Sequence, residues 1–271
     1  MSLPDLRVTL VQGETHWHDP EANRAMYGDL ARSAGGNTDL VILPETFTSG
    51  FSNEALADAE TMDGPSVAWL RELSAEIGAA VTGSVQIRDG DGVYNRLLWA
   101  APGGELAHYD KRHLFRMANE HERYAAGRER LTVEYMGWRI CPLVCYDLRF
   151  PVFNRNRFGH EVAGRFDYDL LLFVANWPAP RRHAWRTLLR ARAIENLACV
   201  AAVNRVGSDG NGIAYSGDSV VLDQLGIELV EIGPHPHVAT ATLSGSALLE
   251  HRARFPAQLD ADDFVLGNSA L

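Results

Sequence analysis

Two short apolar runs, at residues 39–44 and 168–175, constrain the fold of this chain more than any other feature. Apolar runs of this length are expected for strands that are buried on both faces, as in a parallel sheet covered on each side. Segments with helical periodicity lie between the strand-like runs, at 20–34 and 65–77 in the first half and at 181–197 in the second. Alternating strands and helices predict an α/β fold in which helical crossovers join parallel strands.

Glycine-rich turns predict antiparallel strands at the edges of this fold. Residues 89–92 (Asp-Gly-Asp-Gly) and 102–104 (Pro-Gly-Gly) separate strand-like segments in the manner of hairpin turns. The remaining predicted elements are strands at 6–12, 80–87, 94–101, 105–109, 137–144, 199–204, 217–222 and 228–232, and a helix at 153–164. We therefore expect two mixed sheets packed face to face with helices outside, which is a four-layer α-β-β-α sandwich.

The whole chain, residues 1–271, is predicted to form a single domain with its core at about 4–255. No Pro- or Ser-rich linker, low-complexity segment or short repeat marks a boundary within it. The last stretch, 259–271, is acidic and then apolar, so both packing on a partner subunit and disorder are compatible with it.

Composition and charge narrow the class of protein. The net charge of −10 and the pI near 5.4 argue against general binding to nucleic acid or to anionic membranes. The sequence has neither a signal-like leader nor an apolar run of membrane-spanning length, so we expect a cytoplasmic protein. Its three cysteines, Cys141, Cys145 and Cys199, are expected to be reduced, because they cannot all pair and lack the spacing of a zinc or redox motif.

Cys145 differs from the other cysteines because polar groups follow it at once. The segment 143–151 reads Leu-Val-Cys-Tyr-Asp-Leu-Arg-Phe-Pro, so an apolar strand ends in a thiol, an acid and an arginine. Open α/β sheets bind ligands at the carboxyl ends of their strands. A free cysteine is more often a small buried hydrophobe, and we interpret Cys141 and Cys199 in that way, since each lies inside an apolar strand. Cys145 is instead predicted to be a nucleophile.

Two charged residues end other strand-like runs in the same way. Glu45 directly follows 41–44 and is the candidate base that activates the thiol. Lys111 ends the run Tyr-Asp-Lys, where it would bind the oxyanion of a tetrahedral intermediate together with the backbone N–H of Tyr146. Its charge is also expected to favour the thiolate of Cys145. Solvated surface charges are the common alternative for such an acid and such a lysine, but the three groups together predict thiol-based acyl transfer.

Along nearly its whole length, the chain resembles the nitrilase, or carbon–nitrogen hydrolase, superfamily. The glutamate motif of that family matches 43–47 (Leu-Pro-Glu-Thr-Phe), and the lysine motif matches 109–115 (Tyr-Asp-Lys-Arg-His-Leu-Phe). The cysteine motif matches 145–151 (Cys-Tyr-Asp-Leu-Arg-Phe-Pro). Three ordered motifs with matching flanks make the resemblance specific.

The resemblance implies the α-β-β-α sandwich, a thioester mechanism and pairing of subunits into dimers or larger assemblies. It implies neither a metal nor an organic cofactor. A second family glutamate, which lies near the lysine and the substrate, matches Glu120. Glu122 is the competing choice, but Glu120 places the family glycine that follows, Gly127, at the usual distance.

Within the superfamily, 113–120 and the Asn-Trp-Pro run at 176–178 look most like the ω-amidase branch. The resemblance implies that such an enzyme acts with water on 2-oxoglutaramate and 2-oxosuccinamate and releases ammonia. The far carboxylate of these substrates needs a cationic contact, for which the candidates are Arg116, Arg128, Arg149 and Arg181. Candidate pocket walls, for which core packing is an equally good interpretation, are Phe47, Phe51 and Trp177.

Other functions remain open from the sequence alone. An N-carbamoyl amine hydrolase needs the same three residues with a different pocket. Thiol-dependent acyl transfer to an amine differs only in what intercepts the thioester. A non-catalytic binding or scaffold protein on this fold is the alternative from another class, and the intact Glu45, Lys111 and Cys145 argue against it.

Two further patterns are interpreted as structural. The His-x-His pairs at 16–18 and 235–237 have no third ligand in the sequence, so no metal site is expected there. Arg182, Arg186 and Arg190 recur every four residues and form one basic stripe on a helix. In so acidic a chain, this stripe is expected to face solvent or another subunit and not nucleic acid.

Overall fold

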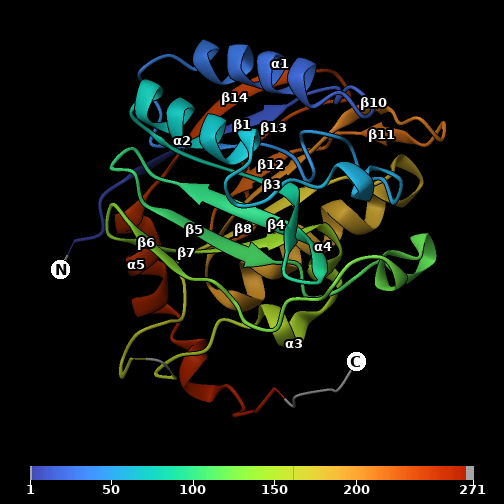
Figure 1. Ribbon diagram of the computed structural model, residues 1–271. Helices are drawn as coiled ribbons and strands as arrows, with labels where there is room; N and C mark the ends of the chain where they lie inside the picture. The colour runs from blue at the N-terminus through green and yellow to red at the C-terminus, as the bar shows by residue number, and fades with distance from the viewer. Residues whose placement is uncertain (1, 161, 267–271) are drawn as a thin grey trace.

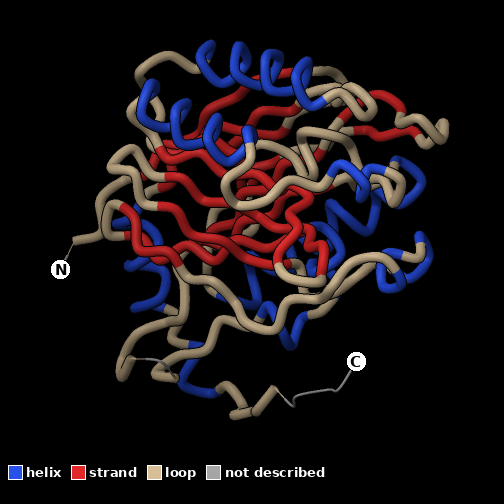
Figure 2. The backbone as a smooth tube through the Cα atoms, viewed as in Figure 1, coloured by secondary structure: helices blue, strands red, loops and turns tan. Residues whose placement is uncertain are grey.

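The computed structural model describes residues 2–160 and 162–266, and in this part of the chain two large sheets pack face to face (Figures 1 and 2). The first sheet contains, in spatial order, β14 (His237–Leu243), β1 (Leu6–Gln12), β2 (Leu40–Ile42), β3 (Ala80–Asp89), β4 (Gly92–Ala100) and β5 (Leu106–Asp110). The second contains β13 (Glu228–Glu231), β12 (Val220–Leu222), β9 (Cys199–Asn204), β8 (Leu170–Ala175), β7 (Trp138–Val144) and β6 (Val133–Tyr135).

Both sheets have a parallel centre and antiparallel edges, as predicted. β1, β2 and β3 run parallel in the first sheet, and β7, β8 and β9 run parallel in the second. β4 and β5 extend the first sheet as an antiparallel meander, and β14 pairs antiparallel with β1 on its other side. Because parallel strands share one direction, their carboxyl ends in each sheet lie along one edge.

Helices cover the outer faces of both sheets and complete the four-layer sandwich (Figure 1). α1 (Pro20–Ser33) and α2 (Pro65–Ile77) lie on the first sheet, and α4 (Arg182–Asn196) and α5 (Gly245–Arg254) lie on the second. A one-turn helix, α3 (Pro151–Asn154), follows β7 after a tight turn.

Local sequence explains where the first two helices begin and end. The Asp19 side chain accepts a hydrogen bond from the backbone N–H of Ala22, and Pro20 occupies the first turn of α1. α2 begins with Pro65 and ends at Gly78, whose φ of 66° is the left-handed conformation that glycine adopts without strain.

The alternation of side chains along β2 explains the layering. Leu40 and Ile42 point between the sheets and join a large buried cluster with residues of β8 and β9. Val41 points the other way and packs with Tyr27 of α1 and Leu70 of α2. A strand covered on both faces in this way explains why the sequence shows an unbroken apolar run there.

The helix predicted at 153–164 is wrong beyond its first residues, since α3 ends at Asn154. The Asn156 side chain donates to the carbonyls of Tyr168 and Asn196, and its Oδ1 accepts from the Tyr168 N–H. Asparagine competes with helical hydrogen bonds by binding backbone groups in this way. Gly159 and Gly164 then adopt positive φ angles of 73° and end any helical path.

Several elements were not predicted. These are β14 and α5 near the end of the described chain, β6, and a hairpin of β10 (Val206–Ser208) and β11 (Ala214–Ser216). β14 pairs with β1 along seven residues, from Leu6 opposite Leu243 to Gln12 opposite His237. The hairpin extends from the sandwich beside the functional cavity described below (Figure 1).

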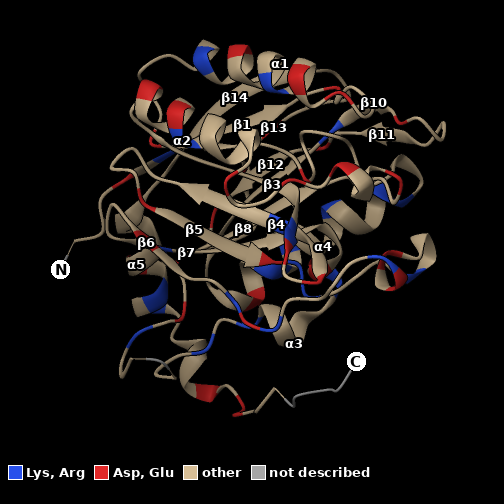
Figure 3. Cartoon of the chain, in the orientation of Figure 1, with Lys and Arg blue, Asp and Glu red and all other residues tan. Residues whose placement is uncertain are grey.

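Charged residues of both signs are mixed along α1 and α2 (Figure 3). Arg32 of α1, for example, forms an exposed ion pair with Glu76 of α2. Among the described residues, no helix is long and apolar enough to cross a membrane.

Candidate functional site

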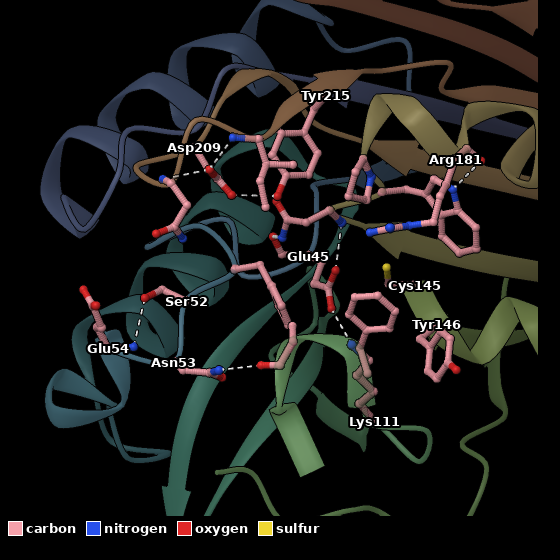
Figure 4. A pocket seen from close by; sticks show the side chains of 18 of the residues that line it. Glu45, Ser52, Asn53, Glu54, Lys111, Cys145, Tyr146, Arg181, Asp209 and Tyr215 are labelled. Carbon is pink, nitrogen blue, oxygen red and sulfur yellow. Dashed lines mark hydrogen bonds and ion pairs between the residues drawn. The ribbon is translucent and has the colours of Figure 1, made fainter. Parts of the chain in front are cut away.

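Strand ends from both sheets meet around one cavity of about 280 Å³. Glu45 and Lys111 follow β2 and β5 of the first sheet, and Cys145 and Asn176 follow β7 and β8 of the second. All four residues line the cavity, and Figure 4 shows Glu45, Lys111 and Cys145 close to one another. The structure therefore brings together the three groups that the sequence placed at separate strand ends.

Cys145 begins a 3₁₀ turn, Cys145–Arg149, immediately after β7. Its φ of 44° lies in the left-handed region, which costs a non-glycine residue of order 1–3 kcal/mol. The sharp change of direction turns the thiol into the cavity, and the side chain remains buried with 9% of its surface exposed.

Asp147 holds this strained turn in place. One of its carboxylate oxygens accepts hydrogen bonds from the Val144 N–H at 3.1 Å and from the Tyr109 hydroxyl at 2.8 Å. The other accepts from the His113 N–H at 3.0 Å and bonds to His113 Nδ1 at 2.7 Å. Since Tyr109 and His113 flank Lys111 in sequence, Asp147 also joins the turn with Cys145 to the strand end with Lys111.

Glu45 is fully enclosed, and polar groups fix both of its oxygens. Oε1 accepts hydrogen bonds from Lys111 Nζ and from Asn95 Nδ2, each at 2.8 Å. Oε2 accepts from the backbone N–H of Asn176 at 2.7 Å. The Asn176 side chain in turn donates to the backbone carbonyl of Glu45 at 2.8 Å and to Thr46 Oγ1 at 2.9 Å. This carboxylate therefore cannot rotate freely.

Lys111 lies between two carboxylates. Its Nζ is 2.8 Å from Glu45 Oε1 and 3.0 Å from both oxygens of Glu120. Burial alone would lower the pKa of Lys111, but the charges of Glu120 and Glu45 outweigh it and hold the pKa well above its usual value. The group is therefore an ammonium ion at neutral pH.

Glu120, not Glu122, reaches the site. Glu120 is fully buried, and its Oε2 also accepts a hydrogen bond from the Phe115 N–H at 2.5 Å. Burial raises the pKa of Glu120, Glu45 adds to this effect, and Lys111 opposes it. The Glu122 side chain is 62% exposed and lies 3.9 Å from His121.

The expectation that Lys111 keeps Cys145 as a thiolate is wrong. Burial raises the pKa of the Cys145 thiol well above its usual value, and the nearby charge of Glu45 and the hydrogen bond to it raise it further. Lys111 lowers this pKa but does not compensate for these effects, because the charges of two carboxylates already offset its own. Burial and the charge of Glu45 therefore favour the neutral thiol at Cys145.

Some predicted pocket residues line the cavity. The Phe51 ring centre lies 5.3 Å from Lys111 Nζ. The Arg149 guanidinium lies 4.8 Å from a ring centre of Trp177, and that of Arg181 lies 5.2 Å from the Phe115 ring. The predicted residues that line the cavity are Phe51, Arg149, Trp177 and Arg181, together with Tyr146.

The other predicted pocket residues lie elsewhere. Phe47 is fully buried in the core under α1 and α2, where its ring packs against Tyr27 and Trp69. The lack of a side chain at Gly83 makes room for it, since a Cβ there would lie 3.0 Å from the Phe47 ring. Arg116 and Arg128 are exposed, and neither belongs to the cavity lining.

Asn95 is a site residue that the sequence did not indicate. It lies in β4, fully buried, and its side-chain amide contacts both Glu45 and Glu120. Its signal is weak, because Tyr-Asn-Arg at 94–96 reads as an ordinary start of an alternating strand. Only the pairing of β4 with β5 brings it next to Lys111, whose N–H donates to the Asn95 carbonyl at 3.0 Å.

Comparison with known proteins agrees with this geometry. The carbon-nitrogen hydrolase family model matches residues 7–250. Omega-amidase YafV of Escherichia coli K12 is 48% identical over 265 residues, which cover 97% of this chain and all of that protein. The 2-oxoglutaramate amidase of Bacillus subtilis is 32% identical over 92% of this chain and 95% of its own length.

Solved structures share the fold as well. XC1258 from Xanthomonas campestris is a CN-hydrolase superfamily protein with an arsenic adduct in its active site. It is 67% identical, with a TM-score of 0.96 over 97% of this chain and 99% of that one. A mutant amidase from Nesterenkonia sp. AN1, in which acrylamide has added to the active site cysteine, is 26% identical. Its TM-score is 0.79 over 94% of this chain and 99% of that one. The chain therefore belongs to the carbon-nitrogen hydrolase family.

Proposed function

We propose that the chain is an ω-amidase, which hydrolyses the terminal amide of 2-oxoglutaramate and 2-oxosuccinamate to a carboxylic acid and ammonia. The observation that carries the proposal is the buried pair of Glu45 and Lys111, which lies with Cys145 in a cavity that two arginines also line. The similarity to Omega-amidase YafV and to 2-oxoglutaramate amidase supports this substrate class.

In the proposed reaction, Glu45 takes the proton of the Cys145 thiol as the sulfur bonds to the amide carbon. The electrons of the C=O double bond move to oxygen and give a tetrahedral oxyanion. Lys111 Nζ and the backbone N–H of Tyr146 donate to this oxygen, and loss of one such donor typically costs about 3–4 kcal/mol of barrier. Glu45 returns the proton to the amide nitrogen, and the C–N bond breaks. Ammonia departs, and a thioester remains on Cys145.

Water then hydrolyses the thioester. Glu45 removes a proton from the water molecule as its oxygen attacks the thioester carbon, and the same donors hold the second oxyanion. The C–S bond breaks, the proton returns to sulfur, and the carboxylic acid is released. The neutral thiol in the resting site fits this cycle, because Glu45 needs to act only when a substrate is bound.

Glu120 is assigned an orienting role. Its contacts with both Lys111 Nζ and the Phe115 N–H fix the ammonium and the adjoining loop at once. A second carboxylate on the far side of Lys111 also keeps this ammonium charged while it binds an anionic oxygen.

Arg149 and Arg181 are the two of the four candidate arginines that we assign to the far carboxylate of the substrate. Both line the cavity, and each guanidinium is held against an aromatic ring. A planar guanidinium fixed in this way recognises a carboxylate through paired hydrogen bonds. Phe51 and Trp177 would then contact the carbon chain between the two ends of the substrate.

We also propose that residues 1–271 form one domain, with its core at about 4–255, that assembles into a homodimer or a larger homo-oligomer. The shared core between the sheets supports a single folding unit. Exposed apolar side chains at Ile194 of α4 and at Ile227, which follows Gly226 next to the Ile194 side chain, support contact between subunits. A reducing cytoplasm suits a reaction that needs a free thiol.

The substrate assignment is tested by ammonia release. We expect kcat/KM for 2-oxoglutaramate and 2-oxosuccinamate to exceed that for N-carbamoyl amino acids by about 100-fold or more, since a site built for one polar group discriminates strongly. Faster hydrolysis of an N-carbamoyl amine would overturn the assignment. The same assay with an added amine acceptor distinguishes hydrolysis from acyl transfer, because only transfer yields a new amide.

A further inference from the structure

Asn95 makes the contacts of a residue that controls the chemistry of Glu45. Its Nδ2 donates to Glu45 Oε1 at 2.8 Å and lies 3.5 Å from Glu120 Oε1, so one amide group bridges the two buried carboxylates. We propose that Asn95 is a positioning residue that directs the proton of Cys145 to one particular oxygen of Glu45. The inference rests on the amidase reaction proposed above.

Counting the acceptor sites of Glu45 identifies that oxygen. A carboxylate oxygen has two lone pairs near the carboxyl plane. On Oε1 they accept from Lys111 Nζ and from Asn95 Nδ2. On Oε2 one accepts from the Asn176 N–H, which leaves the other for a proton. With Asn95 in place, the thiol proton is therefore taken up, and later returned, at Oε2.

The Asn95 amide can donate to Glu45 and Glu120 only when its nitrogen, and not its oxygen, faces them. Its Oδ1 is buried and accepts no hydrogen bond from the residues that the structure describes. The reverse orientation would direct this oxygen at the oxygens of Glu45 and Glu120 and would leave both without their shared donor. The structure therefore holds the Asn95 amide with its N–H group toward the two carboxylates.

Removing the donor should impair the chemical step more than substrate binding. For Asn95→Ala we expect kcat to fall about 10- to 100-fold. Without Asn95, Oε1 of Glu45 competes with Oε2 for the proton, and the Glu45 carboxylate is less well aligned. KM should change less than about threefold, since Asn95 is not among the residues that line the cavity. The acid limb of the pH–rate profile should move to higher pH, because an acid group loses a donor to its charged form.

Asn95→Asp gives a sharper test with a side chain of the same shape. The new carboxyl group places a third acid around one ammonium, and when ionised it has no hydrogen to donate to Glu45. When protonated, it can donate again. The ratio of its kcat to the wild-type kcat should therefore rise as the pH falls. A purely structural role for Asn95 predicts a ratio that does not depend on pH.

Asn156→Ala is the matched control. Asn156 is also a buried asparagine whose Nδ2 makes two hydrogen bonds, but it binds the carbonyls of Tyr168 and Asn196 and does not line the cavity. This variant should lose stability to a similar extent with an unchanged pH profile. If Asn95→Ala fails to fold, the isosteric Asn95→Asp still gives the pH-dependent ratio.

Alkylation of Cys145 by iodoacetamide tests the inference independently of any substrate. The alkylation rate is followed against pH by intact mass, with Cys145→Ala to identify the site. The acid limb should move to higher pH in Asn95→Ala and stay in place in Asn156→Ala. Identical profiles for wild type and Asn95→Ala would overturn the role of Asn95, whereas failure to hydrolyse ω-amides would overturn only the proposed substrate.

Discussion

At the scale of single residues, the charges of the site favour a neutral thiol at Cys145. Two buried carboxylates, Glu45 and Glu120, surround one ammonium, Lys111, and both contacts are within 3.0 Å. The cluster therefore has a net negative charge when all three groups are ionised. A thiolate beside it would be both desolvated and repelled, which explains why the pKa of Cys145 is raised.

This leads to a prediction about pH. An acid whose pKa is raised stays protonated to higher pH, so Cys145 should remain a thiol through about pH 8.5, the usual cysteine pKa. The ultraviolet difference spectrum between wild type and Cys145→Ala should therefore show no thiolate absorbance near neutral pH. A full thiolate signal at pH 7 would mean that Lys111 outweighs burial and Glu45, as the sequence suggested.

At the scale of elements, the positions where strands end were easier to predict than which strands pair with one another. The apolar run before Glu45 and the polar groups after Cys145 are local patterns, and the structure places both residues at strand ends. Local patterns do not report which strands pair. β14 pairs with β1 from the far end of the chain, and Asn95 reaches the site only through the β4–β5 pairing.

Hydrogen bonds from an asparagine side chain explain why the helix predicted at 153–164 is wrong. The two phenylalanines after β2 could not be assigned to core or cavity because they lie in the same short segment. Asn156 binds backbone groups of distant segments, which a helical periodicity cannot reveal. Phe47 and Phe51 follow the same strand and are four positions apart in sequence, but one joins the core and the other the cavity. The chain turns at Thr46, whose φ is 40°, and again between the two aromatic residues at Gly50, whose φ is 77°. The conformation at Thr46 has no signature in the sequence.

Gly127 supports the strand end that carries Lys111. A Cβ at this position would lie 2.0 Å from the Asp110 carbonyl oxygen, and the Gly127 N–H donates to the Lys111 carbonyl at 3.0 Å. Gly127→Ala should therefore displace the end of β5. We expect a loss of about 1–3 kcal/mol in the free energy of unfolding and a fall in kcat of about 10- to 100-fold.

Gly36→Ala is the control for this substitution. A Cβ at Gly36 would have no atom within 4 Å, and the residue has no positive φ, so alanine should change stability by less than about 1 kcal/mol. Denaturant unfolding and steady-state kinetics of both variants provide the measurement. Equal effects at the two positions would contradict the supporting role of Gly127.

At the scale of the whole molecule, the site exists only where the two sheets meet. Glu45 and Lys111 belong to the first sheet and Cys145 and Asn176 to the second, and the bond from the Asn176 N–H to Glu45 crosses between them. The predicted four-layer arrangement is confirmed by the structure. This four-layer arrangement explains why the cavity forms at one end of the sandwich. Residues at the opposite end contribute to stability without contacting the cavity.

Arg252 of α5 serves stability at that opposite end. Its buried guanidinium bonds to Asp169 at 2.5 Å and to the carbonyls of Tyr168 and Leu197, which precede β8 and β9. Arg252→Ala should lower the free energy of unfolding by about 3 kcal/mol, because it leaves the partly buried carboxylate of Asp169 without this charged partner. At temperatures where the variant is folded, kcat should stay within about twofold of wild type.

Arg254→Ala provides the comparison on the same helix. The Arg254 side chain is 78% exposed, and its ion pair within the described residues is with Glu250 one turn away, so its loss should change stability by less than about 0.5 kcal/mol. Thermal unfolding followed by circular dichroism, with kcat at room temperature, checks both variants. A large fall in kcat for folded Arg252→Ala would contradict the separation between the two ends of the sandwich.

The proposed reaction depends most on Cys145 as the nucleophile, and ammonia release from 2-oxoglutaramate by wild type and Cys145→Ala tests this directly. We expect steady release from the wild type and a loss of at least about 1,000-fold in the variant. The variant should keep the fold, because alanine retains the Cβ in the strained turn that Asp147 holds. Substantial ammonia release by folded Cys145→Ala would contradict the thioester mechanism.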